Sequence, residues 1–147
     1  MLLQHPLVDK YDVSSIKRWA CGAAPIGTDL IEMVEKRTRI SVRCGYGMTE
    51  TTCVISIATV DNTKPASVGK LIPNMSGKLV DGELWLKGPN IMKGYLRNPG
   101  ADAVTFTDDG WMRTGDVCQF DEDGDMFVVD RVKEVSLRRN ISKRDTR

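Results

Sequence analysis

The residues best suited to chemistry lie at positions 45–50, where Gly45 and Gly47 flank Tyr46 and precede Thr49 and Glu50. Glycines permit a sharp turn and let a ligand come close to the main chain. Backbone N–H groups and a hydroxyl can hold a phosphate, a carboxylate can hold magnesium, and an aromatic ring can stack on a base. This grouping favours a nucleotide site, although a Gly-x-Gly segment is also typical of an ordinary turn with an exposed glutamate.

A second candidate is the carboxylate of Asp116, which follows Gly115 at the end of the run that begins at Trp111. After a glycine turn, a carboxylate can accept hydrogen bonds from the two hydroxyls of a ribose. The alternative is an exposed aspartate in a turn.

The acidic run at 121–125 resembles a calcium loop only superficially. Met126 stands where an EF-hand requires glycine, and Val132 stands where it requires glutamate. Apolar residues flank the run on both sides, so we expect a β-hairpin here.

Several function classes are disfavoured by composition. His5 is the only histidine, and the cysteines form no C-x-x-C pair, which argues against a zinc site and against a histidine-dependent hydrolase. No apolar run approaches the roughly 20 residues of a membrane span, and the apolar start at residues 2–3 is too short for a signal peptide. We therefore expect a cytoplasmic protein with reduced thiols. The four cysteines are Cys21, Cys44, Cys53 and Cys118.

The net charge of +1 hides an uneven distribution. Seven basic and two acidic residues follow position 130, whereas the preceding part has 14 basic and 18 acidic residues. Such a tail can bind nucleic acid, but a solvated, poorly ordered end is the more common case. We expect no nucleic-acid partner.

The elements that position these residues begin with a strand–helix–strand unit. Residues 16–20 and 40–44 read as strands, the second because apolar and polar residues alternate there. Between them, Thr28 is a suitable N-cap for a helix that ends near Arg37. Two strands joined through a helix predict a parallel α/β unit.

The pattern changes near Asn62. Beyond it, glycine or proline recurs every few residues as far as position 110 and separates short runs such as 77–80 and 83–87. This spacing predicts a small, strongly bent antiparallel sheet or barrel. We therefore expect an α/β piece at 1–62, a β subdomain with a hairpin at 63–130, and a final segment at 131–147.

Five motifs along the chain resemble, in the same order, those of the adenylate-forming (AMP-dependent) synthetase and ligase superfamily. Tyr46-Gly47-Met48-Thr49-Glu50 is similar to its Y-G-x-T-E signature, in a form that looks most like 4-coumarate–CoA ligases. The others are G-A-A-P at 22–25, G-E-L-x-x-x-G-x-x-x-M-x-G-Y at 82–95, W-x-R-T-G-D at 111–116 and D-R-x-K-E at 130–134. The longest of these, at 82–95, indicates bends rather than a catalytic role.

The resemblance implies a reaction in two steps. A small carboxylic acid attacks ATP in the presence of Mg²⁺ to form an acyl-adenylate and pyrophosphate, and the thiol of CoA then displaces AMP. It also implies a fold, the C-terminal part of a large adenylation domain: a parallel α/β piece, a small distorted β-barrel-like subdomain and a hinge, followed here by an unrelated basic tail.

The same resemblance implies roles for individual residues. Thr49 would contact a phosphate oxygen and Glu50 would hold magnesium, while Asp116 and Arg131 would hold the ribose and Lys133 would mark the hinge. Tyr46 would stack on the adenine. Four small residues, Gly22, Ala23, Gly45 and Gly47, would lie near the adenine or the acyl group.

The chain departs from the family pattern at both ends. Residues 1–20 show no phosphate loop, and the pattern breaks after Glu134, where Leu137 and Asn140 replace an expected lysine and glycine. We therefore expect a truncated acyl-CoA ligase. The alternative is a catalytically inactive remnant with weak or no nucleotide binding.

Overall fold

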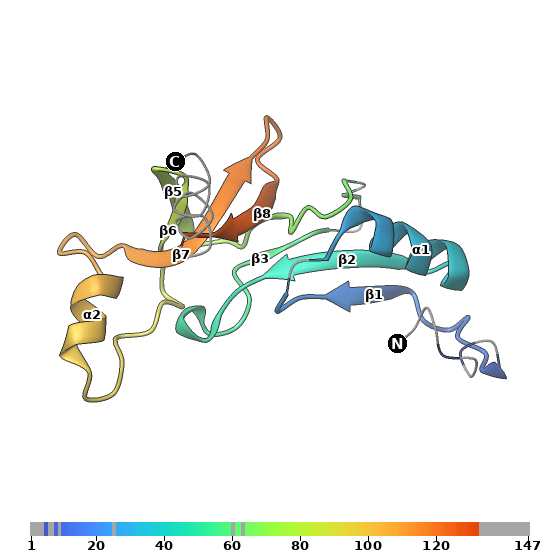
Figure 1. Ribbon diagram of the computed structural model, residues 1–147, viewed down its shortest axis with the longest axis horizontal. Coiled ribbons are helices and arrows are strands. Elements are labelled where there is room, and N and C mark those ends of the chain that lie inside the picture. Colours follow the sequence, from blue (N-terminus) through green and yellow to red (C-terminus); the bar gives the residue numbers. More distant parts are fainter. Residues whose placement is uncertain are drawn as a thin grey trace, which may run out of the picture.

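Two four-stranded sheets lie side by side along the long axis of the molecule (Figure 1). The computed structural model describes residues 5, 8, 10–24, 26–59, 61, 62 and 64–132. The expected mixed α/β architecture is confirmed. The domain limits at residues 62 and 130 remain predictions.

The first sheet has the strand order β1-β2-β3-β4. Strands β1 (Arg18–Cys21) and β2 (Ser41–Tyr46) run parallel, and helix α1 (Thr28–Thr38) connects them as predicted. The short strands β3 (Ser56–Ile57) and β4 (Lys70–Leu71) complete the sheet in antiparallel orientation. In this sheet only β1 and β2, which α1 connects, run parallel. A parallel pair needs a crossover connection between its strands, and that connection is usually a helix.

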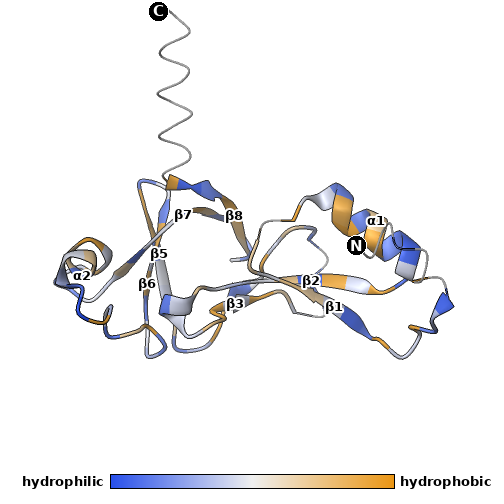
Figure 2. Cartoon of the chain, turned by 60° about the horizontal axis from the view of Figure 1, so that its bottom comes forward, coloured by the Kyte–Doolittle hydropathy of each residue, from blue (hydrophilic) through white to orange (hydrophobic). Residues whose placement is uncertain are grey.

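Helix α1 covers one face of β1 and β2, and its apolar side faces the sheet (Figure 2). Ile31 and Val34 are buried there against Val42 and Cys44. The predicted N-cap is wrong by one residue: Gly27 is the cap, with extended backbone, and Thr28 is the first helical residue. Gly27 has no side chain to accept the bond that a threonine cap would take from the helix backbone.

The second sheet is antiparallel throughout, with the order β5-β6-β7-β8. This agrees with the expectation of short antiparallel strands beyond residue 65, and α2 (Pro99–Thr105) is a single short helix between two of them. Within the described part of the chain this sheet is open and does not close into a barrel. Its strands are β5 (Ser76–Val80), β6 (Glu83–Lys87), β7 (Met112–Phe120) and β8 (Met126–Arg131).

A shared core joins the two sheets. Ile55, from the segment before β3, is fully buried among Leu84, Leu86, Met112 and Met126 of the second sheet. A main-chain bridge between Gly69 and Met126 crosses the junction as well. The end of β2 is thereby held next to the β7–β8 hairpin.

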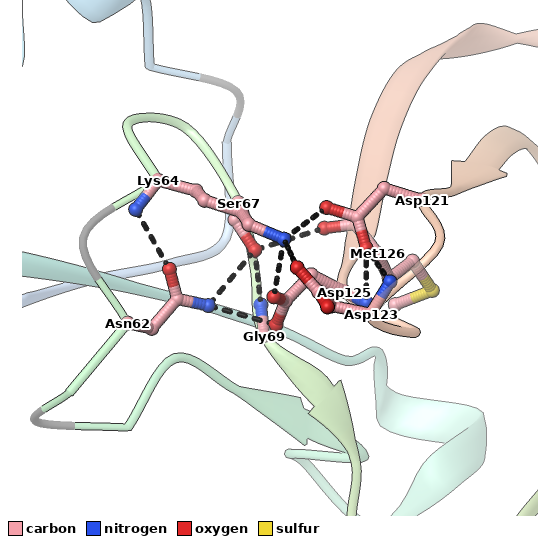
Figure 3. Close-up of polar contacts among 8 residues, drawn as sticks. All are labelled: Asn62, Lys64, Ser67, Gly69, Asp121, Asp123, Asp125 and Met126. Atoms are coloured by element: carbon pink, nitrogen blue, oxygen red, sulfur yellow. Dashed lines mark hydrogen bonds and ion pairs between the residues drawn. The ribbon is translucent and has the colours of Figure 1, made fainter.

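The expected hairpin at 121–125 is present, and its acidic side chains surround a lysine (Figure 3). The ammonium group of Lys64 lies 2.5 Å from Asp121, 2.6 Å from Asp123 and 3.2 Å from Asp125. Asn62 also donates a hydrogen bond to Asp125 at 2.8 Å. The cluster therefore ties the loop at 61–67 to the β7–β8 turn, with Lys64 in the place that a cation would take.

No helix in the described ranges is both long enough and apolar enough to cross a lipid bilayer.

Candidate nucleotide site

A cavity of about 300 Å³ opens where the end of β2 meets the β7–β8 hairpin. Its walls come from four segments: the loop after β1, the end of β2, the loop before β4 at Val68, and β7 with β8. They are lined by Ala23, Ala24, Gly45, Tyr46, Gly47, Met48, Val68, Asp116, Val128, Val129, Asp130 and Arg131. Eight of these belong to motifs that are widely separated in the sequence, so the fold gathers them at one place.

Tyr46, Asp116 and Arg131 form a chain of direct contacts in this cavity. The Tyr46 hydroxyl donates a hydrogen bond to Oδ2 of Asp116 at 2.6 Å, across 70 positions in the sequence. Oδ1 of the same carboxylate lies 3.0 Å from Nε of Arg131. The carboxylate is buried, whereas the side chain of Arg131 is 69% exposed. A buried charge is thus compensated by one phenol and one solvent-facing cation.

Asp116 does not occupy the turn predicted from Gly115. Both residues lie inside β7, and Asp116 takes a buried position that alternates with half-buried neighbours, as Met112, Thr114 and Cys118 do. Gly115 has a positive φ of 74°, and its N–H donates to Glu83 at 2.8 Å. The glycine therefore relieves an irregular pairing between β6 and β7, and the buried carboxylate faces β2 rather than solvent.

The environment of Tyr46 keeps its phenol protonated. Burial raises the pKa of Tyr46 strongly, and the adjacent Asp116 carboxylate raises it further because it accepts the phenolic hydrogen. The ring is consequently held at a fixed angle by its hydroxyl end, and Tyr46 lines the cavities on both sides of it.

A larger and mainly apolar cavity of about 830 Å³ adjoins the first. It is lined by residues of β1, β2 and β3 and of the turn between β2 and β3. Gly22 and Thr49 line this cavity and are absent from the walls of the first. The segments at 45–48 and Ala23 are shared by both, so they form the partition between them.

Glu50 lies apart from both cavities, in the single 3-10 turn η2 (Thr49–Thr51). Its Oε1 accepts a hydrogen bond of 2.6 Å from the hydroxyl of Tyr95, and its carbonyl accepts one of 2.8 Å from the N–H of Met92. The 82–95 segment, to which no role was assigned, therefore positions this carboxylate. A contact across 45 residues between two exposed loops leaves no signal in a single sequence.

The donor set around Glu50 suits a magnesium ion that arrives with a nucleotide. Mg²⁺ is commonly bound by one or two carboxylates, with substrate phosphates and water as the remaining ligands. Glu50 supplies one carboxylate, and the hydroxyl of Thr49 is adjacent in the same turn. In the described part of the chain, the one grouping of three acidic side chains close enough to share a metal is the Asp121 cluster around Lys64.

Two predicted residues cannot be placed, because Lys133 and Glu134 lie outside the described residues. The basic tail lies outside them too. Conversely, Val68, Val128 and Val129 line the first cavity without having been singled out. Apolar strand residues of this kind look the same in sequence whether they face a core or a ligand.

Comparison with known proteins gives a consistent result. The sequence model of a family described as "AMP-binding enzyme" matches residues 1–96. Peroxisomal OPC-8:0-CoA ligase 1 of Arabidopsis thaliana is 44% identical over 141 residues, covering 86% of this chain and 26% of the relative. Luciferin 4-monooxygenase of Photinus pyralis is 41% identical over 142 residues, covering 88% of this chain and 26% of the relative. The chain thus spans about a quarter of the length of these curated relatives.

Solved structures agree with this. MatB from Rhodopseudomonas palustris with ATP bound superposes with a TM-score of 0.82 at 32% identity, covering 90% of this chain and 29% of that one. A malonyl-CoA ligase complex with methylmalonyl-CoA and AMP gives a TM-score of 0.72 at 32% identity, over 78% of this chain and 27% of that one.

Proposed function

The chain belongs to the AMP-binding enzyme family, and we propose that it supplies the nucleotide-binding part of an AMP-forming acyl-CoA ligase. In such a reaction a carboxylate oxygen attacks the α-phosphorus of ATP, and pyrophosphate leaves. The thiol of CoA then attacks the acyl carbon, and AMP leaves. The motifs quoted above and the names of the relatives, several of which are CoA ligases, support this reaction class.

One observation carries the proposal: the 2.6 Å contact between Tyr46 and Asp116 at the wall of a cavity. An aromatic ring and a carboxylate beside a glycine-lined gap are the groups that a nucleoside requires. The ring stacks on the base and the carboxylate accepts from the ribose hydroxyls. Each carboxylate oxygen has two lone pairs, so Asp116 retains acceptor capacity beyond its bonds to Tyr46 and Arg131.

The remaining roles follow from the positions of the side chains. Gly45 and Gly47 let the base approach the main chain. Gly22 and Ala23 stand beside the apolar cavity, which we propose receives the acyl group of the small carboxylic acid. Arg131 is exposed enough to leave Asp116 and neutralise an AMP phosphate.

Thr49 and Glu50 would act on the phosphate side of the nucleotide. The hydroxyl of Thr49 would donate to a phosphate oxygen. Glu50 would bind the magnesium that accompanies ATP, where a metal ion offsets the charge that develops as pyrophosphate leaves. Lys133, which follows β8 by two residues, would act as the hinge toward the CoA half-reaction.

The test is binding of AMP, measured by calorimetry or by ligand-observed NMR. We expect the chain to bind AMP and expect Asp116→Asn to weaken binding by at least about tenfold, because hydrogen bonds to a charged acceptor contribute about 1.5–3 kcal/mol. Asp108→Asn is the matched control, since it makes the same chemical change at an exposed turn outside the cavity.

Equal affinity for the two variants would contradict the assignment of Asp116. Absence of AMP binding by the unsubstituted chain, at concentrations where circular dichroism shows it folded, would support the inactive remnant instead. The cytoplasmic location remains a prediction, because one of the relatives is named a peroxisomal ligase.

A further inference from the structure

Two cysteines face each other across the parallel strands of the first sheet. Cys21 is the last residue of β1, and its register partner on β2 is Cys44. Neighbouring strands lie about 4.8 Å apart, and disulfides join residues whose Cα atoms are roughly 4.4–6.8 Å apart. The backbone spacing of this pair therefore falls within the range that a disulfide bridges.

Both side chains are on the same face of the sheet, toward α1. Cys44 is buried in the cluster of Ile31, Val34 and Val42, and Cys21 packs against that cluster from its edge. Both also line one small cavity of about 60 Å³ beneath the nucleotide pocket. The two thiols are close enough for Cys21, together with burial, to raise the pKa of the Cys44 thiol.

The two partners differ in access. Cys21 is partly exposed, whereas Cys44 is buried. A small oxidant can thus reach Cys21 first, and Cys44 is placed to resolve the product. The other thiols offer no such pairing, because Cys53 is exposed on a loop and Cys118 is buried in the core between the two sheets.

We propose that Cys21 and Cys44 form a reversible cross-strand disulfide, which makes this edge of the first sheet sensitive to oxidants. With a disulfide such as oxidised glutathione, the Cys21 thiolate attacks one sulfur and a glutathione thiolate leaves. The Cys44 thiolate then attacks the Cys21 sulfur of the mixed disulfide, and the second glutathione thiolate leaves. Two protein thiols are oxidised, their two protons pass to the two glutathione thiolates, and one glutathione disulfide is thereby reduced to two thiols.

The bond would tighten the two strands where they enter the pocket. The Cβ atoms of a disulfide are about 3.8 Å apart, closer than the usual strand spacing of about 4.8 Å. The next residues are Gly22 and Gly45, and a Cβ placed on Gly22 would already lie 3.5 Å from the carbonyl oxygen of Gly45. Oxidation would thus bring together and stiffen the loop that carries Ala23 and the end of β2 that carries Tyr46.

The first test is disulfide mapping in a Cys53→Ser background. Trypsin releases Cys21 in peptide 19–36 and Cys44 in peptide 44–70, because Lys64 precedes proline and resists cleavage. Position 53 lies in the second peptide, so its substitution removes the competing assignment. We expect oxidised glutathione to link the two peptides in the folded chain, faster than in urea, and expect dithiothreitol to separate them.

Cys44→Ser in the same background is the control, and it should stop at a mixed disulfide on Cys21. The proposal is wrong if the folded chain with both cysteines also stops at the mixed disulfide on Cys21. It is equally wrong if the folded chain keeps both thiols free under conditions in which the urea-unfolded chain forms the Cys21–Cys44 disulfide.

A second measurement uses hydrogen exchange of the amides at 19–24 and 42–47. We expect exchange to slow by about tenfold on oxidation of the pair, a typical size for coupling between linked segments, and to stay unchanged in Cys44→Ser under the same oxidant. If hydrogen exchange of these amides is unchanged in the disulfide-linked chain, the proposed stiffening is wrong. Both readouts concern the chain itself, so they hold whether or not it binds AMP.

Discussion

At the scale of single residues, the contact of Tyr46 with Asp116 combines a structural and a functional role. The carboxylate is buried and carries a charge that needs compensation, which the phenol and Arg131 provide. The same three groups form the wall of the cavity. A substitution here therefore has to be judged by stability as well as by binding.

The raised pKa of Tyr46 predicts a loss of stability at alkaline pH. In the unfolded chain tyrosine ionises near pH 10, whereas folded Tyr46 keeps its proton to higher pH. The folded state then binds more protons, so the free energy of unfolding falls as pH rises above about 10 and is unaffected below it. We expect urea unfolding between pH 9 and 11.5 to show this fall.

Tyr46→Phe should make the fall shallower, because it removes this phenol. Part of the fall should remain, since the pKa of Lys64 and that of the buried Cys118 thiol, at about 12, are raised as well. An identical slope in Tyr46→Phe would show that the Tyr46 proton is not held by the fold.

At the scale of elements, the turn that leaves β2 depends on one close approach. Gly47 passes so near the next loop that a Cβ at this position would lie 1.6 Å from the carbonyl oxygen of Cys53. Real structures do not tolerate such a contact with main chain. The second glycine of the Gly-x-Gly segment is thus required for packing, independently of any ligand.

We therefore expect Gly47→Ala to destabilise the chain by about 3 kcal/mol or more, as severe overpacking does. Gly100→Ala is the matched control: it lies in α2, where an added Cβ would come no closer than 3.9 Å to Oδ1 of Asn98, so alanine should leave stability unchanged or raise it by up to about 1 kcal/mol. Urea midpoints of the two variants measure the difference. Similar urea midpoints for Gly47→Ala and Gly100→Ala would show that the turn after β2 rearranges to accept the added methyl group.

The β7–β8 turn depends on a charge rather than on a close approach. Its three aspartates lie close together around Lys64, and without that cation they would repel one another. We expect Lys64→Met to lower the melting temperature, and expect the loss to shrink in 1 M NaCl, where the Debye length is only about 3 Å. Lys93→Met, at an exposed position outside the cluster, serves as the matched control, and a loss that is independent of salt would assign the effect to packing of the lysine stem.

At the scale of the whole molecule, the described part of the chain covers the first sheet on one face only. Helix α1 packs on one side of β1 and β2 (Figures 1 and 2), and residues of β1, β2 and β3 line the apolar cavity of about 830 Å³. A mainly apolar groove at the surface commonly marks an interface or a binding site. For the 147-residue polypeptide on its own, it predicts a tendency to aggregate.

The same polypeptide should form no acyl-adenylate at a useful rate. Adenylation brings two anions together, so its barrier is dominated by charge, and preorganised cations are usually the main means of lowering it. Among the described residues that line the first cavity, Arg131 is the one cation, beside Asp116 and Asp130. Loss of a single well-placed electrostatic group costs roughly 100- to 1,000-fold in rate. Exchange of labelled pyrophosphate into ATP, with a panel of carboxylic acids, measures this.

Pyrophosphate exchange above background would contradict that expectation, provided that Asp116→Ala abolishes it. The control is needed because a contaminating ligase from the expression host would be unaffected by a substitution in this chain.

The sequence alone determined the elements and the family. The α1 helix, the alternating strand before Gly45, the short strands beyond Asn62 and the hairpin at the acidic run all follow from local periodicity and turn residues, which act over a few positions. The ordered motifs identified the adenylate-forming superfamily. Local patterns missed the first helical residue and the placement of Asp116, because a cap and a strand bulge depend on the neighbouring segments.

Only the tertiary structure decided which of these residues meet. It joined Tyr46 to Asp116 and Glu50 to Tyr95, placed Lys64 among three aspartates, and set Cys21 opposite Cys44. Such contacts depend on strand register and on the shared core around Ile55 that docks one sheet against the other. Burial of apolar surface drives that docking without direction, so a single sequence carries no local trace of the pairs it creates.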